Sequence, residues 1–357
     1  MTATAEQETG RLAHLGGSRT ALLFFVLLTI ASMALIAELA LGPVQIAPDR
    51  VLATLTGGGE PMESAILWQI RIPRAALGIA VGVSMALSGA ALQGLLRNPL
   101  AEPGLIGVTA GASLGAVMAI VLGGLVVGLM PDVIAPFLLP IAAFIGGATV
   151  IAILFSLVRF GSGPSVATLI LAGVAINAIV GAAIGVLIYI SDDQQLRDLT
   201  FWTMGSLGVA DTRLIGIVTV LALLTFPVFL GSTRALDLLQ LGERAAFYSG
   251  LNVNRARMRI AAATALSVGA VTCAAGPIGF IGLVAPHIAR MMFGPGHKVL
   301  LPASALIGVI LVLAADLGVR LAVPPAEPPI GLATSLIGGP FFLWLLMRQV
   351  SRGRVIA

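Results

Sequence analysis

Charged side chains are scarce in this sequence of 357 residues. Only 10% of its positions are Asp, Glu, Lys or Arg, whereas a soluble domain carries about 25%. Lysine occurs once, as Lys298, so the net charge of +4 includes no polybasic arm. The composition therefore argues against a soluble globular protein and against a nucleic-acid-binding protein.

Patterns for disulfides, metal ions and nucleotides are also missing. Cys273 is the single cysteine, so no disulfide can form within the chain. His14, His287 and His297 are dispersed, and no G-x-x-x-x-G-K-[ST] phosphate loop is present. We expect no metal site, no resident cofactor and no catalytic activity in this chain.

Hydrophobic residues, by contrast, fill 58% of the sequence, and glycine occurs 43 times. A bilayer core needs about 20 apolar residues per helical span, and small residues allow membrane helices to pack closely. The apolar run Thr20–Leu41 is longer than the core of a cleavable signal peptide. The chain therefore has room for about ten spans and for no sizeable soluble domain.

Eight apolar tracts are evident: Thr20–Leu41, Ala75–Leu96, Leu105–Met130, Val133–Val158, Val166–Ile190, Leu214–Leu230, Val299–Val323 and Ile330–Met347. A ninth uncharged stretch between Arg259 and Arg290 is too long for one span, and Gly276-Pro277 in its middle breaks helices. Two short spans hinged at this pair bring the total to ten. The fold class we predict is an all-α membrane protein with about ten transmembrane helices.

The distribution of Lys and Arg predicts the orientation. With the N-terminus inside, 14 of the 20 basic residues fall on the cytoplasmic side. We therefore expect cytoplasmic tails at residues 1–19 and 349–357, and a single membrane domain at residues 20–348. Two longer connections remain: an external one at Gly42–Arg74, expected to be loop with a short helix, and a cytoplasmic one at Gly231–Arg259. The second carries two short amphipathic patterns, which suit a partner-docking surface or a surface-lying connector.

Few ionisable residues lie within the spans. Glu38, Asp316 and Arg320 are the candidates, and Asp316 and Arg320 are four apart and can pair on one helix. A secondary transporter driven by an ion gradient would need such acids at a central cavity. It is the rival hypothesis from another functional class.

Several motifs closely resemble the FecCD-type, BtuC-like permeases of ABC importers. They are Arg71–Val117, Leu169–Ala178 (LILAGVAINA), Gln195–Leu207 (QLRDLTFWTMGSL), Gly276–Arg290 (GPIGFIGLVAPHIAR) and Glu327–Arg348. The resemblance implies a type II ABC importer transmembrane domain for haem, ferric siderophores or cobalamin. The implied partners are a second copy, two ATPase subunits that carry ATP and Mg, and a periplasmic or lipid-anchored binding protein. The location would be the bacterial inner membrane, with both termini cytoplasmic.

The resemblance also implies roles for individual residues. Arg71, Arg74 and Arg320 would dock the binding protein, although lipid headgroups or Asp316 could also engage them. Within coupling helices at residues 232–256, the ATPase contacts would be Leu241, Gly242, Glu243, Ala245, Ala246 and Gly250.

The pore and gate residues implied by the same resemblance are Ser165, Val166, Ala167, Thr168 and Asn177. Val166 and Ala167 stand where some relatives carry hydroxyls, which predicts a more apolar gate. His287, in APHIAR, is expected to make a structural hydrogen bond rather than to ligate haem. Haem is the preferred cargo, because Ser191–Leu207 is most similar to haem permeases; a siderophore or cobalamin is the alternative.

Overall fold

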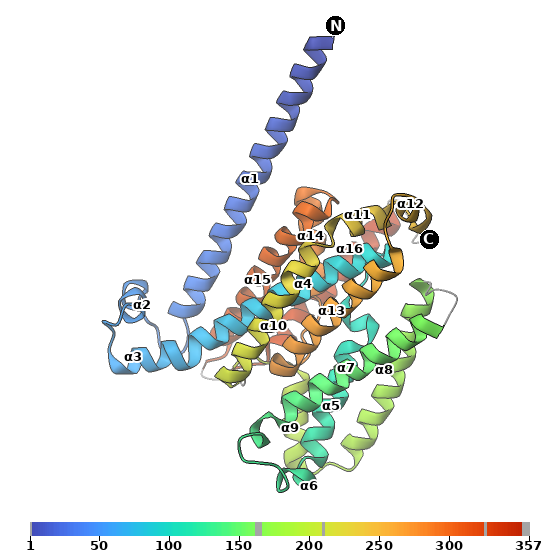
Figure 1. Ribbon diagram of the computed structural model, residues 1–357. Helices are drawn as coiled ribbons and strands as arrows, with labels where there is room; N and C mark the ends of the chain where they lie inside the picture. Colours follow the sequence, from blue (N-terminus) through green and yellow to red (C-terminus); the bar gives the residue numbers. More distant parts are fainter. Residues whose placement is uncertain (1, 161–165, 209–210, 325–326, 352–357) are drawn as a thin grey trace.

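Ten apolar helices form the body of the protein in a computed structural model that describes residues 2–160, 166–208, 211–324 and 327–351 (Figure 1). The ten are α1 (Thr2–Ala40), α4 (Ile72–Leu96), α5 (Val108–Leu122), α7 (Leu138–Phe160), α8 (Val166–Tyr189), α10 (Thr212–Leu230), α13 (Val253–Ala275), α14 (Ile281–Phe293), α15 (His297–Ala322) and α16 (Ile330–Ser351). Within the described ranges, seven helices are long and apolar enough to cross a membrane, and three more are apolar but shorter. The predicted all-α membrane fold is confirmed.

The long uncharged stretch between Arg259 and Arg290 is divided at the predicted place. Helix α13 ends at Ala275, and α14 begins at Ile281. Gly276 has a φ of +70°, and a Cβ there would lie 2.5 Å from the carbonyl oxygen of Trp202. Only glycine suits both the backbone angle and the space. The break is therefore fixed by local chemistry, as the sequence predicted.

A partly buried carboxylate supports the far side of this break. The Glu102 side chain accepts a hydrogen bond from the backbone N–H of Phe280, with 2.6 Å between Oε1 and N. Phe280, just before α14, has a φ of +66°. Burial raises the pKa of Glu102, while the Phe280 hydrogen bond opposes that rise. The turn between α4 and α5 is thereby joined to the start of α14.

Two spans are shorter than the sequence predicted. Helix α5 ends at Leu122 rather than near Met130, and a four-residue helix, α6 (Gly124–Val127), follows it. Gly123 and Gly124 stand at this end, and paired glycines disfavour helix continuation. A 3₁₀ turn at Ala135–Phe137 then precedes α7, which starts at Leu138 rather than Val133.

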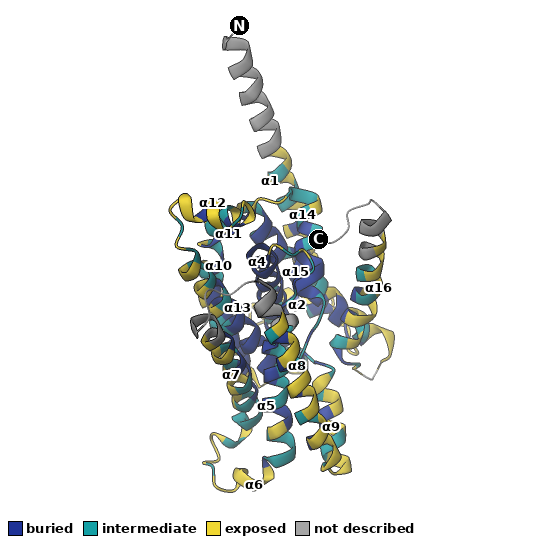
Figure 2. Ribbon diagram, turned by 90° about the vertical axis from the view of Figure 1, so that its right-hand side faces the viewer, coloured by how far each residue is buried: buried dark blue, intermediate teal, exposed yellow. Residues whose placement is uncertain are grey.

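Helix α4 lies at the centre of the bundle. It packs against α10, α13, α14 and α15, and Figure 2 shows it buried, in contrast to α8, α9 and α16. Close approach depends on glycine: a Cβ on Gly82 would lie 2.7 Å from the backbone of Gly308 on α15. Gly89 meets Gly282 of α14 in the same way. Small residues thus bring three helix backbones together, as expected where lipid gives no hydrophobic drive for helix association.

The remaining elements are short. They are α2 (Pro48–Leu55), α3 (Pro61–Ala65), a π-helix at Ile66–Arg71 that leads into α4, a 3₁₀ turn at Pro103–Ile106, α9 (Asp193–Thr203), α11 (Thr233–Gln240) and α12 (Glu243–Tyr248). The short helix pair predicted within Gly231–Arg259 is confirmed as α11 and α12. In Figure 1, α11 and α12 lie at one end of the bundle. Because α1 begins at Thr2, the segment expected as an N-terminal tail continues the first span as a helix.

Candidate functional site

Six ionisable residues gather at the end of the bundle opposite α11 and α12: Glu38, Arg71, Arg74, Asp316, Arg320 and Glu327, called the charge cluster below. Arg74 is central. Its Nε and Nη2 donate to the two carboxylate oxygens of Asp316 at 2.8 and 3.0 Å. Its Nη1 donates to Glu327 Oε2 at 2.5 Å. One guanidinium therefore joins α4 to α15 and to the segment before α16.

The other two arginines complete the charge cluster. Arg320 lies 2.5 Å from Glu38 Oε1 on α1 and 3.3 Å from Asp316 Oδ2, so the predicted pairing of Asp316 with Arg320 is confirmed. Arg71 donates to the carbonyl oxygens of Leu39, at 2.5 Å, and Val44. Carbonyls at a helix C-terminus such as that of α1 lack intrahelical partners and need donors of this kind. The cluster therefore contains three arginines and three carboxylates and is formally neutral, although Arg71 is held by backbone carbonyls rather than by a carboxylate.

All three arginines of the charge cluster are almost fully buried, which the sequence did not predict. The exposed fractions of Arg71, Arg74 and Arg320 are 3%, 5% and 3%. Their guanidinium groups point into the protein, because their partners come from α1, α15 and the segment before α16. Glu327 is the accessible member, with 44% of its side chain exposed. The docking role assigned to the three arginines remains a prediction.

At the opposite end, α11 and α12 form an exposed pair of short helices. The large apolar side chains of Leu241, Phe247 and Tyr248 are exposed there. Glu243 pairs with Arg257 of α13, while Ala245 and Gly250 are accessible and Gly242 is partly so. Gly242 and Gly250 have φ values of +104° and +82°, so both turns of the pair require glycine.

Ala246 departs from the predicted contact set. It is fully buried, in the apolar cluster that also contains Leu236 and Leu239 of α11. Within the six residues of α12, Ala246 occupies the side that faces the bundle. Ala246 therefore holds α12 in place and cannot itself touch a docked partner in this arrangement.

The predicted gate falls mainly outside the described side chains. Ser165 lies outside the described residues, and α8 begins at Val166, but the side chains of Val166, Ala167 and Thr168 are not among those described. Asn177 is half-buried, and its Nδ2 donates to the carbonyl oxygen of Gly104 at 3.5 Å. It connects α8 to the turn before α5. A role for these five residues in the pore remains a prediction.

Helix α8 nevertheless presents a continuous apolar face. Four of its large side chains, at 171, 174, 179 and 186, are exposed: Leu171, Val174, Ile179 and Val186. Around Gly181 and Gly185, where an added Cβ would meet nothing within 4 Å, the surface is open. In a membrane protein such a face is available for lipid or for another subunit.

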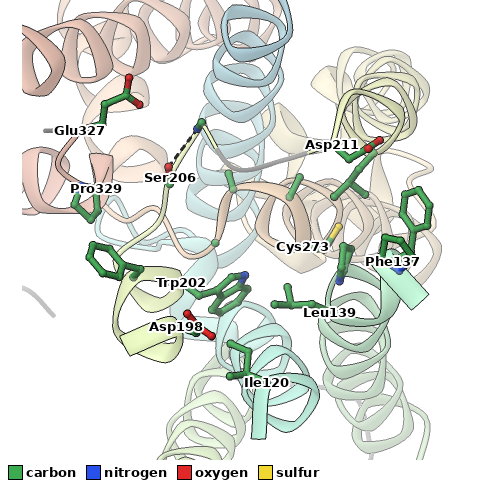
Figure 3. A pocket seen from close by; sticks show the side chains of 18 residues that line it. Ile120, Phe137, Leu139, Asp198, Trp202, Ser206, Asp211, Cys273, Glu327 and Pro329 are labelled. Atoms are coloured by element: carbon green, nitrogen blue, oxygen red, sulfur yellow. Dashed lines mark hydrogen bonds between the residues drawn. The ribbon is translucent and has the colours of Figure 1, made fainter. Parts of the chain in front are cut away.

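A cavity of about 580 Å³ lies between α5, α7, α9, α10 and α13. Trp202 extends into it from α9, and Ile120, Leu139 and Cys273 form its apolar wall (Figure 3). Three carboxylates, Asp198, Asp211 and Glu327, also line it. No local sequence pattern predicts this cavity, because its lining comes from residues more than 200 positions apart in the chain.

His287 is partly buried on α14. Its ring meets that of Phe341 of α16 edge-to-face, with 5.9 Å between centroids. The histidine therefore connects α14 with α16 through an aromatic contact.

Comparison with a solved structure defines the class of protein. A chain described as an inward-facing conformation of a metal-chelate type ABC transporter matches with a TM-score of 0.80 and 30% identity, over 91% of this chain and 99% of that chain. The protein is accordingly the membrane-spanning permease subunit of an ABC importer. Residues 27–348 match the FecCD transport family, and the chain belongs to that family.

Its relatives transport different cargoes. The hemin transport system permease protein HmuU of Yersinia pestis is 48% identical over 293 residues, covering 79% of this chain and 84% of the relative. The vitamin B12 import system permease protein BtuC of Vibrio cholerae is 36% identical over 293 residues, covering 81% and 84%. The resemblance seen in the motifs is thus confirmed at family level.

Proposed function

We propose that this permease carries haem across the bacterial inner membrane. The observation that carries the proposal is the 48% identity to a hemin permease, against 36% and 40% to two vitamin B12 permeases over similar lengths. The few His, Cys and Tyr residues of the sequence agree with it, since cargo leaves more readily from a pore without strong iron ligands.

The proposed assembly contains two copies of this chain and two ATPase subunits. The exposed apolar face of α8 supports contact with a second copy, because two-fold assembly buries the same face of both subunits. The exposed α11–α12 pair supports contact with the ATPases. Closure of the ATPases on nucleotide would then move these helices and switch the pore between outward- and inward-facing states.

We place α11 and α12 in the cytoplasm together with both termini. The excess of Lys and Arg on that side supports this orientation. The charge cluster then faces the periplasm, where the binding protein would deliver cargo. Arg74 is already occupied by Asp316 and Glu327. We propose that a carboxylate of the binding protein reaches Arg74 by displacing Glu327, its accessible partner.

Cobalamin and ferric siderophores remain the alternative cargoes. The family includes vitamin B12 permeases, and the apolar faces described above would suit any bulky chelate. The cavity beside Trp202 does not favour haem as its occupant, because Asp198, Asp211 and Glu327 would repel the two propionates of haem. We therefore place the haem pathway between the two copies rather than in this cavity.

The experiment that tests the proposal uses the complete complex in proteoliposomes. Binding protein loaded with haem, a ferric siderophore or cobalamin is added, and ATP hydrolysis and cargo uptake are measured. Haem-loaded binding protein should stimulate ATP hydrolysis and give uptake, while the other two leave both near the basal level. Stimulation by a siderophore or by cobalamin, without stimulation by haem, would refute haem as the cargo.

A further inference from the structure

Helix α11 is held against the bundle by apolar packing. Leu236 and Leu239 are buried among side chains that include Leu92 of α4, Phe229 of α10 and Leu301 of α15. Apolar burial sets which face of α11 turns inward, but it is non-directional and does not by itself join α11 to one particular neighbour. A device that transmits movement needs directional contacts in addition.

Asp237 supplies such a contact on the same helix. Its Oδ1 accepts two hydrogen bonds from His297, one from the backbone N at 3.0 Å and one from ring Nδ1 at 2.6 Å. His297 is the first residue of α15, and Gly296 before it has no side chain with which to cap the helix. Asp237 therefore caps α15 from α11, where a negative charge also suits the helix dipole.

The same point involves α4. The His297 ring is only 1% exposed and lies over Gly94 of α4, where an added Cβ would be 2.6 Å from Nε2. Gln240, at the end of α11, donates to the carbonyl oxygen of Gly94 at 3.4 Å. Arg290 of α14 faces this region as well and donates to Gln93 Oε1 at 2.9 Å. Helices α4, α11 and α15 thus meet at one polar junction within an apolar environment.

This junction and the charge cluster lie on the same two helices. Helix α4 carries Arg74 near one end and Gly94 near the other, and α15 carries His297 at one end and Arg320 near the other. Between the two ends, Gly82 and Gly308 bring the backbones of α4 and α15 into contact. The pair is therefore joined at its middle and at both ends.

We propose that Asp237 and His297 are positioning residues that make α11 move as one body with α4 and α15. The proposal rests on the proposed importer function, in which the ATPases drive the α11–α12 pair. When the ATPases close, the contact from Asp237 to His297 transmits the displacement of α11 to α4 and α15, and through them to the charge cluster. Without that contact, α11 follows the ATPases while α15 stays behind.

The test compares transport with ATP hydrolysis in the complete complex in proteoliposomes. Cargo moved per ATP hydrolysed is measured for wild type, Asp237→Ala and Asp237→Asn. We expect transport per ATP to fall about ten-fold or more in Asp237→Ala, as for loss of a charge-assisted hydrogen bond. Assembly and basal ATP hydrolysis are measured alongside, so that lost coupling is separated from a disrupted complex. Asp237→Asn should retain most of the coupling, because its amide oxygen can accept both hydrogen bonds. Asp132→Ala, at an exposed aspartate between α6 and α7, is the matched control and should equal wild type.

A second variant, His297→Phe, changes the other partner of the Asp237–His297 contact. It keeps a ring in the buried space and loses only the Nδ1 hydrogen bond, so it should also lower transport per ATP. The double variant Asp237→Ala with His297→Phe should be no worse than the more affected single variant, because both remove one contact.

Two results would overturn the positioning role. One is transport per ATP equal to wild type in both single variants; the other is a parallel loss of assembly, basal hydrolysis and transport, which a purely structural contact would give. A wrong cargo assignment is distinguishable, since it shows as a failure of haem-loaded binding protein to stimulate the wild-type complex. The coupling ratio is then measured with the cargo that does stimulate it.

Discussion

The two ends of α15 contact the rest of the protein through ionisable groups that differ in burial. At the charge cluster, Asp316 and Arg320 are almost fully buried, and their partners Arg74 and Glu38 are buried too. At the other end, buried His297 meets Asp237, whose side chain is 47% exposed. A buried ion pair is costly to open one partner at a time, whereas a half-exposed carboxylate can exchange with water. The comparison suggests a fixed end at the charge cluster and an adjustable end at α11.

Removal of Asp316 should have the largest effect on stability. Asp316→Ala leaves Arg74 and Arg320 buried without their shared carboxylate, and losing one partner of a buried ion pair costs about 3–5 kcal/mol. We expect a much lower thermal unfolding temperature in detergent, together with poor yield from the membrane. The control Asp132→Ala removes an exposed aspartate and should match wild type. Unchanged stability of Asp316→Ala would contradict a fixed end.

A wider separation of α4 from α15 at their midpoints should have the second largest effect on stability. Gly308→Ala places a Cβ against the backbone of Gly82, and overpacking of this kind costs about 1–3 kcal/mol. Gly318→Ala, on the same helix but with nothing within 4 Å of its Cβ, is the matched control. Thermal unfolding of both variants measures the difference. If Gly318→Ala proved the more destabilised, the close contact of α4 with α15 would not be limiting.

Glu327 should matter less for stability than for docking. Glu327→Gln weakens one contact to Arg74, while Asp316 retains both of its own, and a half-exposed pair is worth about 1 kcal/mol or less. We expect a small change in unfolding temperature. If a carboxylate of the binding protein takes the place of Glu327, the variant should bind that protein more tightly, which surface plasmon resonance can measure. Weaker binding would argue against displacement of Glu327.

Arg50 provides the smallest expected effect. It pairs with Glu60 and Glu63 between α2 and α3, and the hydrogen bond to Glu60 raises its pKa. Arg50 and Glu60 are well exposed, so water and salt screen the attraction. Arg50→Ala should leave the unfolding temperature within experimental error at physiological salt. A shift as large as that of Gly308→Ala would show that the short helices before α4 contribute to the fixed end.

The sequence predicted the parts of this fold that depend on local composition. Apolar length predicted ten helices, and Gly276-Pro277 predicted the break, because both are properties of neighbouring residues. The Asp316–Arg320 pair followed from helical spacing. The burial of Arg71 and Arg74 did not follow, since Asp316 and Glu327 lie more than 240 positions away from Arg74. No local pattern marks such partners.

At the end of the bundle that carries α11 and α12, local sequence patterns likewise predicted the helices but not their contacts. Amphipathic spacing predicted α11 and α12, but not that Ala246 faces inward, because six residues are too few to fix the phase of a helix. The contact of Asp237 with His297 joins residues 60 apart. A lone histidine at the start of an apolar tract was the available signal, and its partner became evident only from the packing of α11 on α15.

The claim that this permease imports haem at the expense of ATP is tested most directly by measuring haem uptake by the reconstituted complex. Proteoliposomes contain this permease and its ATPase, with haem-loaded binding protein outside. We expect haem uptake that needs ATP inside the vesicles and persists when ion gradients are dissipated. Uptake that proceeds without ATP hydrolysis and collapses with the gradient would contradict the claim.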